Sequence, residues 1–378
     1  MSAVHHVGFI VEQALGHGTH ARNLQGHLPD DPDIEAHWAL IPWEVRGMAA
    51  HLPLYRSNWT VRAGLRARRA VAWLARQTPL DALFFHTQVP AVLSADWLRR
   101  IPSVVSLDAT PLQYDALGEF YNHDPGPAWL ERLKWRLNRD CFRAARHLVA
   151  WTHWSKAGLV ADYQVPPEKV SVIPPGVDSA WWARPAPRPL VDGPVRILFV
   201  GGDLARKGGL DLLAAFRALR DSAPGPKGAG VELHLASRDS LPPEPGLFLY
   251  HDMQPNSEAL RALYHDCDLF CLPTYGDCLP MVLSEAGAAG LPCVSTKVGG
   301  IAEIVRDGDT GFLTAPGDVA ALTGALRRLV EDAALRRQMG ARAVALVCQE
   351  FDTGANARRL LDLVRKVIEL EEGAGGHG

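Results

Sequence analysis

Short apolar runs alternate along this chain with longer segments in which apolar residues recur every three or four positions. Runs of four to eight apolar residues are typical of buried strands, and the longer period is typical of amphipathic helices. In the first half, strands are expected at 5–11, 82–86, 103–107, 147–151 and 170–173, with helices at 61–76 and 128–146. This alternation predicts βα units, and therefore a parallel sheet with helices on its faces.

The same pattern restarts at VRILFVGG, residues 195–202. Further strands are expected at 231–236, 268–272 and 293–295, with helices at 209–221, 256–265, 279–289, 317–331 and 333–349. Four prolines and a glycine in PAPRPLVDGP, residues 185–194, indicate a linker. We expect an α/β protein with two Rossmann-like parallel-sheet domains facing each other across a cleft. Their expected bounds are 1–180 and 181–350, followed by a helix and flexible tail at 351–378 that crosses back to the first domain.

The composition is that of an ordinary globular protein. Hydrophobic residues make up 47% and charged residues 21% of the chain, which argues against long disordered segments. A net charge of −3 argues against a dedicated nucleic-acid-binding protein. The six cysteines form no CxxC pair and the fifteen histidines are scattered without ligand spacing, so we expect reduced thiols and no metal site. No segment resembles a signal peptide or a membrane span, and a cytoplasmic location is expected.

The first stretch with candidate chemistry is FVGGDLARKGGLDLLAAF at 199–216. An expected strand ends in two glycines, a short loop presents Arg206 and Lys207, and two further glycines open a helix. Glycines let the backbone approach a ligand closely, and the two cations would neutralise a diphosphate. The GxxxxGK[ST] pattern of a Walker A loop is absent. Taken alone, the stretch is equally compatible with a surface turn that carries solvated charges.

The second stretch covers 273–313, from a strand end through two glycine-containing turns. Asp277 precedes an expected helix and Glu285 lies within it, so that both carboxylates would face one cleft and accept hydrogen bonds from sugar or ribose hydroxyls. The alternatives are a helix cap or a turn residue for Asp277 and a solvated helix face for Glu285. Gly299 and Gly300 precede a further helix, whose first backbone N–H groups would point at a phosphate.

The order and spacing of these motifs resemble the retaining glycosyltransferases of family 4, which have the GT-B fold. The resemblance runs from about Ala14 to Phe351 and is strongest over 196–313. The donor-binding signature of that family is an acidic residue, seven others and a glutamate. Asp277 and Glu285 have this spacing, with aspartate where the family usually has glutamate. By resemblance, Asp277 would hold the hydroxyls of the donor sugar and Glu285 would hold the ribose.

The resemblance also implies where the diphosphate binds. Arg206 and Lys207 are similar to the pair that binds it in the family. Many members place an arginine directly after the strand glycine, where this chain has Gly202, so Arg206 is expected to substitute for that arginine. The paired glycines of the second stretch are similar to the phosphate turn of the family, with Glu303 as its acidic residue.

The first half resembles the acceptor domain of the family. LGHGTHARNL at 15–24 falls at a glycine-rich turn, which would place Gly16 and Gly18 under the donor phosphates or the acceptor. His86 matches a frequent histidine at a strand end, and by resemblance it is expected to bind the substrate. Asp108 stands where members commonly carry a histidine near the donor sugar, and an acid there is expected to orient the acceptor hydroxyl.

These likenesses imply transfer of a hexose-type sugar, with retention, from a nucleotide diphosphate sugar, most simply a UDP or GDP sugar. The acceptor would be a hydroxyl group of a glycan, a lipid or a small molecule. Arg206, Lys207 and backbone donors would stabilise the leaving diphosphate, so that neither a metal nor a separate cofactor is expected.

Two other functions are compatible with parts of the sequence. Gly16, Gly18 and Ala21 fit the GxGxxG/A fingerprint of a dinucleotide-dependent oxidoreductase, although no acidic residue ends a second strand at the expected distance. A non-catalytic nucleotide-sugar-binding protein would also be compatible with Asp108 and Asp277. Donor turnover, as opposed to donor binding alone, distinguishes this second alternative from a transferase.

Two arginine-rich amphipathic segments, at 61–76 and 129–146, raise the possibility of peripheral contact with the inner face of a membrane. Basic amphipathic helices bind anionic bilayers. Such helices also pack an apolar stripe on a sheet and leave their arginines in solvent.

Overall fold

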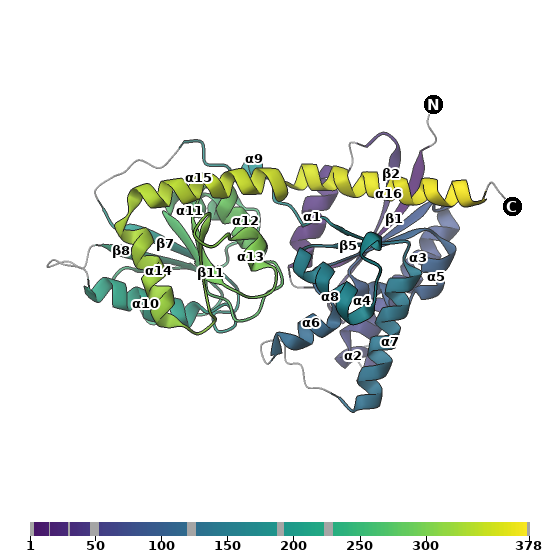
Figure 1. Cartoon of the computed structure of the whole chain (residues 1–378), viewed down its shortest axis with the longest axis horizontal. Helices are drawn as coiled ribbons and strands as arrows, with labels where there is room; N and C mark the ends of the chain where they lie inside the picture. Colours follow the sequence, from purple (N-terminus) through teal and green to yellow (C-terminus); the bar gives the residue numbers. More distant parts are fainter. Residues whose placement is uncertain are drawn as a thin grey trace. The chain divides into compact units, whose positions relative to one another are not determined.

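The computed structural model describes residues 4–14, 16–28, 31–45, 53–118, 126–186, 193–222 and 230–375. The chain divides into two compact units (Figure 1). The first comprises Met1–Ala116, His123–Gly176 and Thr353–Gly378, and the second comprises Val177–Asp352 with Leu117–Asn122. Most of the expected linker, residues 187–192, lies outside the described residues.

The first unit is built on a six-stranded sheet in the order β2-β1-β3-β4-β5-β6, in which every neighbouring pair is parallel. The strands are β1 (His5–Glu12), β2 (Ile34–Ile41), β3 (Ala82–His86), β4 (Ser103–Leu107), β5 (His147–Ala150) and β6 (Val170–Val172). The five predicted strands are confirmed to within one residue at each end. The edge strand β2 was not predicted, because most of its side chains are only partly buried and its apolar run is interrupted by polar residues.

Helices cover both faces of this sheet. They are α1 (His17–His27), α2 (Pro53–Ser57), α3 (Trp59–Gln77), α4 (Gln88–Ala91), α5 (Ala95–Arg100), α6 (Pro111–Ala116), α7 (Ala128–Ala144), α8 (His153–Tyr163) and α16 (Thr353–Gly375). One core cluster packs α3, α7 and α8 on the sheet. The other packs α1 and α16 on it, with Leu360, Val364 and Val367 of α16 almost fully buried. The C-terminal helix is therefore part of the core of the first unit.

The second unit repeats this architecture with the strand order β12-β11-β10-β7-β8-β9, again all parallel. Its strands are β7 (Val195–Val200), β8 (Val231–Ala236), β9 (Leu247–Tyr250), β10 (Leu269–Leu272), β11 (Cys293–Thr296) and β12 (Gly311–Thr314). Its helices are α9 (Ser179–Trp182), α10 (Gly209–Ser222), α11 (Glu258–Asp266), α12 (Met281–Ala288), α13 (Ile301–Ile304), α14 (Val319–Glu331) and α15 (Ala333–Glu350). The strands β9 and β12, four residues each, were not predicted.

Each sheet has one point at which the strand order reverses. It lies between β1 and β3 in the first sheet and between β7 and β10 in the second. In doubly wound sheets the loops at the carboxyl ends of these two strands diverge and leave a crevice where ligands bind. The predicted fold class, two Rossmann-like parallel sheets, is confirmed. Candidate functional residues are therefore expected in the loops after β1, β3, β7 and β10.

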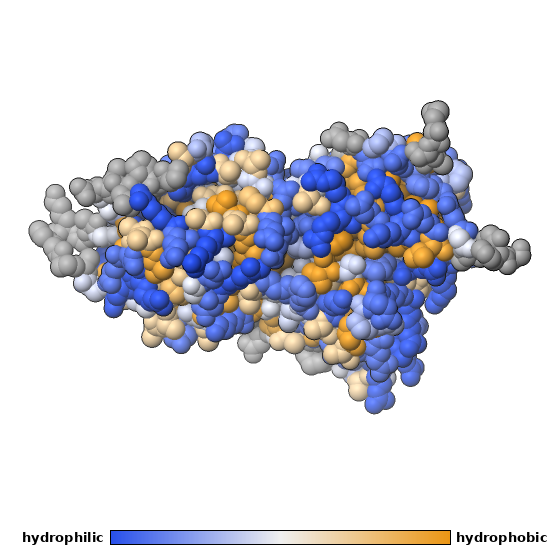
Figure 2. Space-filling view, turned by 45° about the horizontal axis from the view of Figure 1, so that its top comes forward, coloured by the Kyte–Doolittle hydropathy of each residue, from blue (hydrophilic) through white to orange (hydrophobic). Residues whose placement is uncertain are grey.

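The face shown in Figure 2 is mainly hydrophilic, with apolar patches between the polar areas. Among the described helices, none combines the length and the apolar character that crossing a bilayer requires.

Candidate functional site

The loop after β7 lies directly against the end of β10. Gly208 has a φ of +71°, and a Cβ atom there would lie 1.9 Å from the carbonyl oxygen of Pro273. A residue with a side chain would collide with that carbonyl, so glycine is required for the close approach. The tight turn is closed by hydrogen bonds from the Lys207 N–H to the Asp203 carbonyl and from the Gly209 N–H to the Leu204 carbonyl. These contacts fix where Arg206 and Lys207 lie.

Lys207 forms an ion pair with Asp277. Its ammonium Nζ donates to both carboxylate oxygens of Asp277, at 2.6 and 2.8 Å. Thr274 donates its hydroxyl to the same carboxylate at 2.7 Å. The side chains of Lys207 and Asp277 are only 15% and 11% exposed, so the ion pair is weakly screened by water. An ammonium has three N–H donors, and two of them are directed at Asp277.

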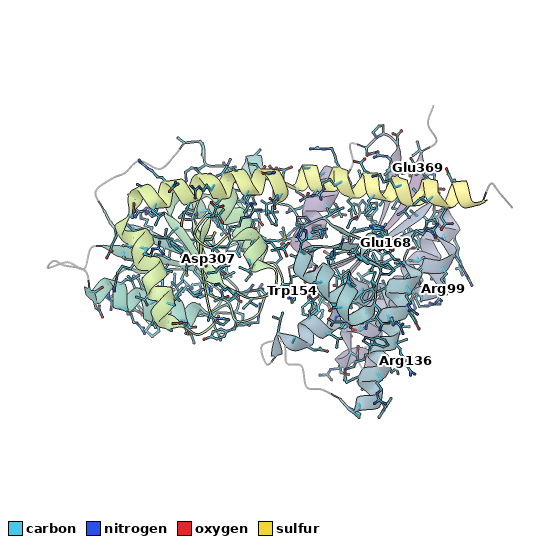
Figure 3. The ribbon with its side chains drawn as sticks, viewed as in Figure 1. Arg99, Arg136, Trp154, Glu168, Asp307 and Glu369 are labelled. Carbon is cyan, nitrogen blue, oxygen red and sulfur yellow. The ribbon has the colours of Figure 1, made fainter. Side chains whose placement is uncertain are left out.

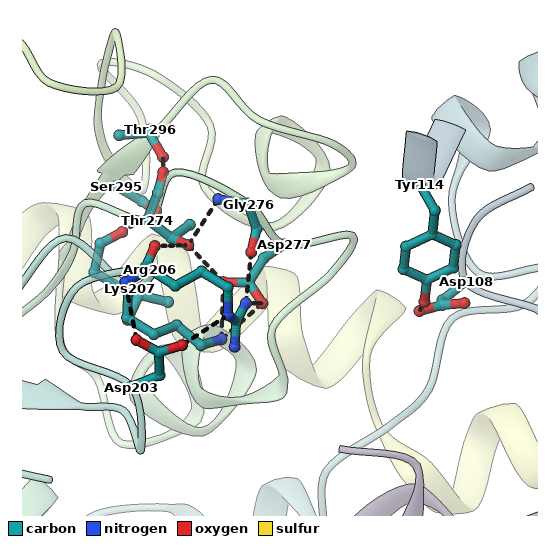
Figure 4. A network of polar contacts seen from close by, with 11 residues as sticks. Asp108, Tyr114, Asp203, Arg206, Lys207, Thr274, Gly276, Asp277, Ser295 and Thr296 are labelled. Carbon is teal, nitrogen blue, oxygen red and sulfur yellow. Dashed lines mark hydrogen bonds and ion pairs between the residues drawn. The ribbon is translucent and has the colours of Figure 1, made fainter. Parts of the chain in front are cut away.

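Arg206 connects the same two loops. Its guanidinium donates to the Gly276 carbonyl at 2.7 Å and lies 3.4 Å from the carboxylate of Asp277. It also lies 3.4 Å from the carboxylate of Asp203. Figure 4 shows both cations converging on the loop after β10. The charges of Arg206 and Lys207 are thus matched by two aspartates, and the four side chains together carry no net charge.

The loop after β8 adds a third cation that sequence reasoning missed. Asp239 accepts a hydrogen bond from the Leu204 N–H at 2.8 Å, which holds the loop beside the one after β7. The exposed side chain of Arg238 lies across Gly202: its Nε, Cζ and Cδ atoms are 3.8–4.0 Å from the place where a Cβ of residue 202 would stand. Within the part of the chain that the structure describes, no hydrogen bond or ion pair holds this guanidinium. In the sequence, this arginine is indicated only by Gly202, which has no side chain and so leaves room for it.

The predicted phosphate turn also packs on the loop after β10. Gly299 has a φ of +54°, and a Cβ there would lie 2.4 Å from the carbonyl oxygen of Asp277. The Gly300 N–H donates to the Cys278 carbonyl at 2.7 Å, so in this arrangement it is not directed at a ligand. Glu303 is half-buried in α13, a helix of only four residues. The turn therefore packs on the backbone of the loop that carries Asp277. Its role in binding phosphate stays a prediction.

Glu285 lies inside the protein, and the alternative of a solvated helix face is wrong. Its side chain is buried in α12 and accepts a hydrogen bond from the Tyr264 hydroxyl at 2.9 Å. Burial raises the pKa of Glu285 to about 7, so the carboxyl is partly protonated near neutral pH. The alternative of a helix cap at Asp277 is also wrong, because Pro280 is the N-cap residue of α12.

In the first unit, a chain of polar side chains follows the strand ends at the reversal point. Glu12 ends β1 and accepts hydrogen bonds from Thr87 at 2.6 Å and Trp59 at 2.9 Å. A ring nitrogen of His17 lies 3.7 Å from the Glu12 carboxylate, and the other lies 2.9 Å from Nε2 of His86. Burial raises the pKa of the Glu12 carboxyl.

His86 is fully buried and stacks on the Trp151 ring at 5.0 Å between centroids. Burial, with the neighbouring His20 and His17, lowers the pKa of His86 well below its usual value, so the ring is neutral. The ring has no exposed surface and contacts His17, His20 and Trp151, so a substrate-binding role for His86 stays a prediction. Gly16 is the N-cap residue of α1, and a Cβ there would meet nothing within 4 Å. A Cβ at Gly18, two residues further, would meet only the Gln13 side chain, so the backbone here is open.

Asp108 follows β4 and is buried within its own loop. One carboxylate oxygen accepts from the Ala109 N–H at 2.9 Å, and the other accepts from the Tyr114 hydroxyl (Figure 4). These bonds hold the start of α6 against the strand end. A role for Asp108 at the acceptor hydroxyl stays a prediction.

Two family models match this chain. Residues 16–181 match the one described as Glycosyltransferase Family 4, and residues 194–332 match the one described as Glycosyl transferases group 1. Among curated proteins, a glycogen synthase of Mycobacterium tuberculosis is 34% identical over 191 residues, which cover 49% of this chain and 45% of that protein. A D-inositol 3-phosphate glycosyltransferase of Salinispora tropica is 31% identical over 260 residues, 59% of this chain and 52% of that protein. The chain thus spans about half the length of the curated relatives it matches.

Solved structures share the fold over nearly the whole chain. A sucrose-phosphate synthase from Thermosynechococcus elongatus superposes with a TM-score of 0.73 at 17% identity, covering 97% of this chain and all of that one. Anabaena HepE, in complex with UDP-glucose, superposes with a TM-score of 0.68 at 18% identity, covering 96% of this chain and 99% of that one. The two family models match consecutive halves of the chain, and the two sheets are those of the GT-B architecture. The chain therefore belongs to the group 1 glycosyltransferases of family 4.

Proposed function

We propose that this protein transfers a sugar from a nucleotide diphosphate sugar to a hydroxyl acceptor. The observation that carries the proposal is the convergence of Lys207, Arg206 and Asp277 on neighbouring loops at the reversal point of the second sheet. That is where doubly wound sheets bind phosphorylated ligands. The HepE structures with UDP and with UDP-glucose support a uridine donor, and the names of the curated relatives support sugar transfer.

In the proposed reaction, the donor diphosphate lies over the loop after β7. The third N–H of the Lys207 ammonium and the Arg206 guanidinium bind its oxygens, and Asp277 accepts a hydroxyl of the sugar. As the bond between sugar and diphosphate breaks, negative charge grows on the leaving oxygen and strengthens its interaction with these cations. One preorganised donor of this kind contributes about 3–4 kcal/mol to the transition state. The side-chain cations supply this charge, so the proposal needs no metal.

The proposed stereochemistry is retention, with the acceptor hydroxyl attacking the face from which the diphosphate departs. The leaving diphosphate then takes the acceptor proton, so that no carboxylate has to act as a nucleophile. We also propose that Glu285, which is buried in α12, receives the ribose hydroxyls. A carboxyl whose pKa is about 7 can both donate and accept a hydrogen bond near neutral pH.

Charge balance suggests that Arg238 completes the diphosphate site. The diphosphate of a nucleotide sugar carries two negative charges. The positive charges of Arg206 and Lys207 are already balanced by Asp203 and Asp277. Arg238 is exposed on the adjacent loop, and its Nε and Cζ atoms lie 3.8 and 3.9 Å from the place where a Cβ of Gly202 would stand. We propose that it swings onto the diphosphate and supplies the positive charge that the pair beside Asp277 cannot supply alone.

Arg238→Ala is expected to weaken binding of a nucleoside diphosphate by about 10- to 100-fold, since a hydrogen bond to a charged group contributes about 1.5–3 kcal/mol. Binding of the nucleoside without phosphates should be unchanged. Isothermal titration with UDP, GDP and the matching nucleosides measures both. The control is Arg337→Ala, an exposed arginine on α15, which should bind like the unmodified protein. Equal UDP affinity in the two variants would exclude Arg238 from the site.

A thermal-shift screen over nucleoside diphosphates and their sugars tests the function itself. A ligand that binds only the folded protein raises the unfolding midpoint, and at 100 times its Kd it adds about 2.7 kcal/mol. Stabilisation by one nucleotide series is expected, with the sugar conjugate hydrolysed or transferred on incubation. The absence of any response would refute the proposal. Binding without turnover of any donor would instead favour the non-catalytic nucleotide-sugar-binding alternative.

We also propose that α7 lies on the inner face of a membrane, and the structure distinguishes it from α3. In α3, Arg62, Arg66 and Arg68 are held by contacts inside the first unit, so they serve the fold. In α7, Trp129, Leu133 and Leu137 form an exposed stripe four residues apart, with exposed fractions of 65%, 45% and 38%. The amino-terminal half of this helix projects beyond the other helices of the first unit (Figure 1).

Two arginines border the apolar stripe of α7. Arg132 and Arg136 are exposed and lie one position before Leu133 and Leu137, and Figure 3 labels Arg136 on this helix. An apolar stripe with adjacent cations suits the surface of an anionic bilayer. Each arginine contributes about 1 kcal/mol near such a surface, so replacing both by alanine should weaken binding about thirtyfold.

Cosedimentation with phosphatidylcholine vesicles, with and without phosphatidylserine, measures this effect. Trp129→Glu should abolish binding to the anionic vesicles, whereas Trp73→Glu, an exposed tryptophan on α3, should leave it unchanged. Raising the salt concentration should weaken the contact. Binding that is equal for both vesicle types, or insensitive to Trp129, would contradict a membrane-docking role for α7.

A further inference from the structure

Three polar side chains meet near the amino ends of β1 and β2. Glu12 and His86 lie at the other end of the first sheet, where the strands finish. In the register of these parallel strands, His6 is paired with Glu35, and His37 lies two residues beyond Glu35. Side chains two residues apart on a strand point to the same face. His6, Glu35 and His37 are therefore brought together by the sheet itself, although 31 residues separate the two histidines.

The donor atoms of these side chains converge on one point. Nδ1 of His6 lies 3.1 Å from Nε2 of His37. Oε2 of Glu35 lies 3.4 Å from Nδ1 of His6, and Oε1 of Glu35 lies 3.6 Å from Nε2 of His37. All three ligand atoms lie within 4.8 Å of one another. The rings are tilted by 42° with centroids 5.3 Å apart, so their nitrogen edges face each other and the rings are not stacked.

These separations suit a tetrahedral metal ion. Zinc binds imidazole nitrogen and carboxylate oxygen at about 2.0–2.2 Å, which places neighbouring ligands about 3.3–3.5 Å apart at the tetrahedral angle. We propose that His6 Nδ1, His37 Nε2 and one oxygen of Glu35 form a site for a divalent transition-metal ion of the zinc class, with water as the fourth ligand. Two imidazoles and a carboxylate favour Zn²⁺, Co²⁺, Ni²⁺ or Cu²⁺ over Mg²⁺ and Ca²⁺, which prefer oxygen ligands.

The surroundings allow such an ion to enter and give it a structural role. The side chains of His6 and His37 are 32% and 21% exposed, and that of Glu35 is 57% exposed, so the ion would reach them from solvent. The site joins β2, an edge strand, to β1. It lies on the edge of the sheet away from the loops that bind ligands, so its occupation would stabilise the first unit without taking part in sugar transfer.

Titration of the full-length protein with Co²⁺ tests the proposal, because tetrahedral Co²⁺ has strong visible absorption. One equivalent is expected to bind with this spectrum and to be displaced by Zn²⁺. His37→Ala and Glu35→Ala should each weaken binding by at least about tenfold, and His6→Ala with His37→Ala should abolish the spectrum. Zn²⁺ should raise the unfolding midpoint of the unmodified protein and not that of the double variant.

His5→Ala is the matched control, since His5 lies on the same strand and points to the opposite face, toward Asp81. It should retain the spectrum and the shift in midpoint. Circular dichroism of the metal-free variants checks that each one is folded. A double variant that still binds one equivalent, loss of binding in His5→Ala, or the absence of stoichiometric Co²⁺ binding by the unmodified protein would each overturn the proposal.

Discussion

Lys207→Ala is expected to reduce the rate of sugar transfer by about 100- to 1,000-fold, the usual effect of removing one preorganised donor to a leaving group. The loss should appear mainly in kcat, since charge on the diphosphate grows as the sugar departs. Steady-state kinetics with the donor identified by thermal shift would measure it. Near-normal turnover in this variant would exclude Lys207 from binding the diphosphate.

The same substitution should also lower stability, and the two effects can be separated. Removing Lys207 leaves the carboxylate of Asp277, only 11% exposed, with Arg206 at 3.4 Å as its remaining cation, and breaking a buried ion pair costs up to about 3–5 kcal/mol. The double variant Lys207→Ala with Asp277→Asn removes that charge. It should recover most of the lost stability in urea unfolding while its turnover stays low. If turnover recovered together with stability, the role of Lys207 would be structural alone.

Asp277→Asn alone has a different expected signature. An amide still accepts from Thr274 and binds Lys207 less strongly, so that Lys207 remains available for phosphate. The rate of turnover of the sugar donor should fall more than the affinity for the free nucleoside diphosphate. Steady-state kinetics measures the first quantity and titration calorimetry the second. Equal losses for both would mean that Asp277 acts only by holding the loop.

The sequence was sufficient for the sheets because a strand buried on both faces is a continuous apolar run. β3 and β4 are fully buried and mainly apolar, and both were predicted to the residue. β8 was also predicted to the residue, although its apolar residues alternate with Glu232 and His234. The edge strand β2 and the short strand β12 lack such a continuous apolar run, since one is half-exposed and the other has four residues beginning with glycine. Local pattern alone therefore could not place the outer strands, which are held by their neighbours in the sheet.

The candidate site could be predicted only in part, because its contacts join residues that are far apart in the sequence. The residue types and order of Arg206, Lys207 and Asp277 are written in the chain, but the pairing of Lys207 with Asp277 spans 70 residues. That pairing follows from the adjacency of β7 and β10, which only the strand order establishes. Arg238 was missed because it approaches Gly202 from the loop after a neighbouring strand, and His6 and His37 were missed because they meet across neighbouring strands. Spacing along the chain carries no record of such contacts.

The close packing of the loops after β7 and β10 predicts that Gly208→Ala is strongly destabilising. A residue other than glycine at a φ of +71° costs about 1–2 kcal/mol, and the added Cβ would also stand 1.9 Å from the Pro273 carbonyl oxygen. The loop has to move to relieve that overlap, so a total loss of at least about 3 kcal/mol is expected. The unfolding midpoint in urea measures it. The matched control is Gly324→Ala within α14, where a Cβ would meet nothing within 4 Å. It should stabilise the same unit by about 0.5–1 kcal/mol, because alanine restricts the unfolded chain.

The shift of the loop after β7 in Gly208→Ala should reduce the rate of turnover as well as the stability. Lys207 precedes Gly208 directly, and its ammonium lies 2.6 Å from Asp277 only because the two loops are in contact. A shift of about 1 Å in a positioning group costs about 100-fold in rate. Gly208→Ala should therefore lose turnover at temperatures well below its own unfolding midpoint, where the protein is still folded. Turnover that stays normal up to the midpoint would show that the contact between the loops serves the fold and does not place the cation for catalysis.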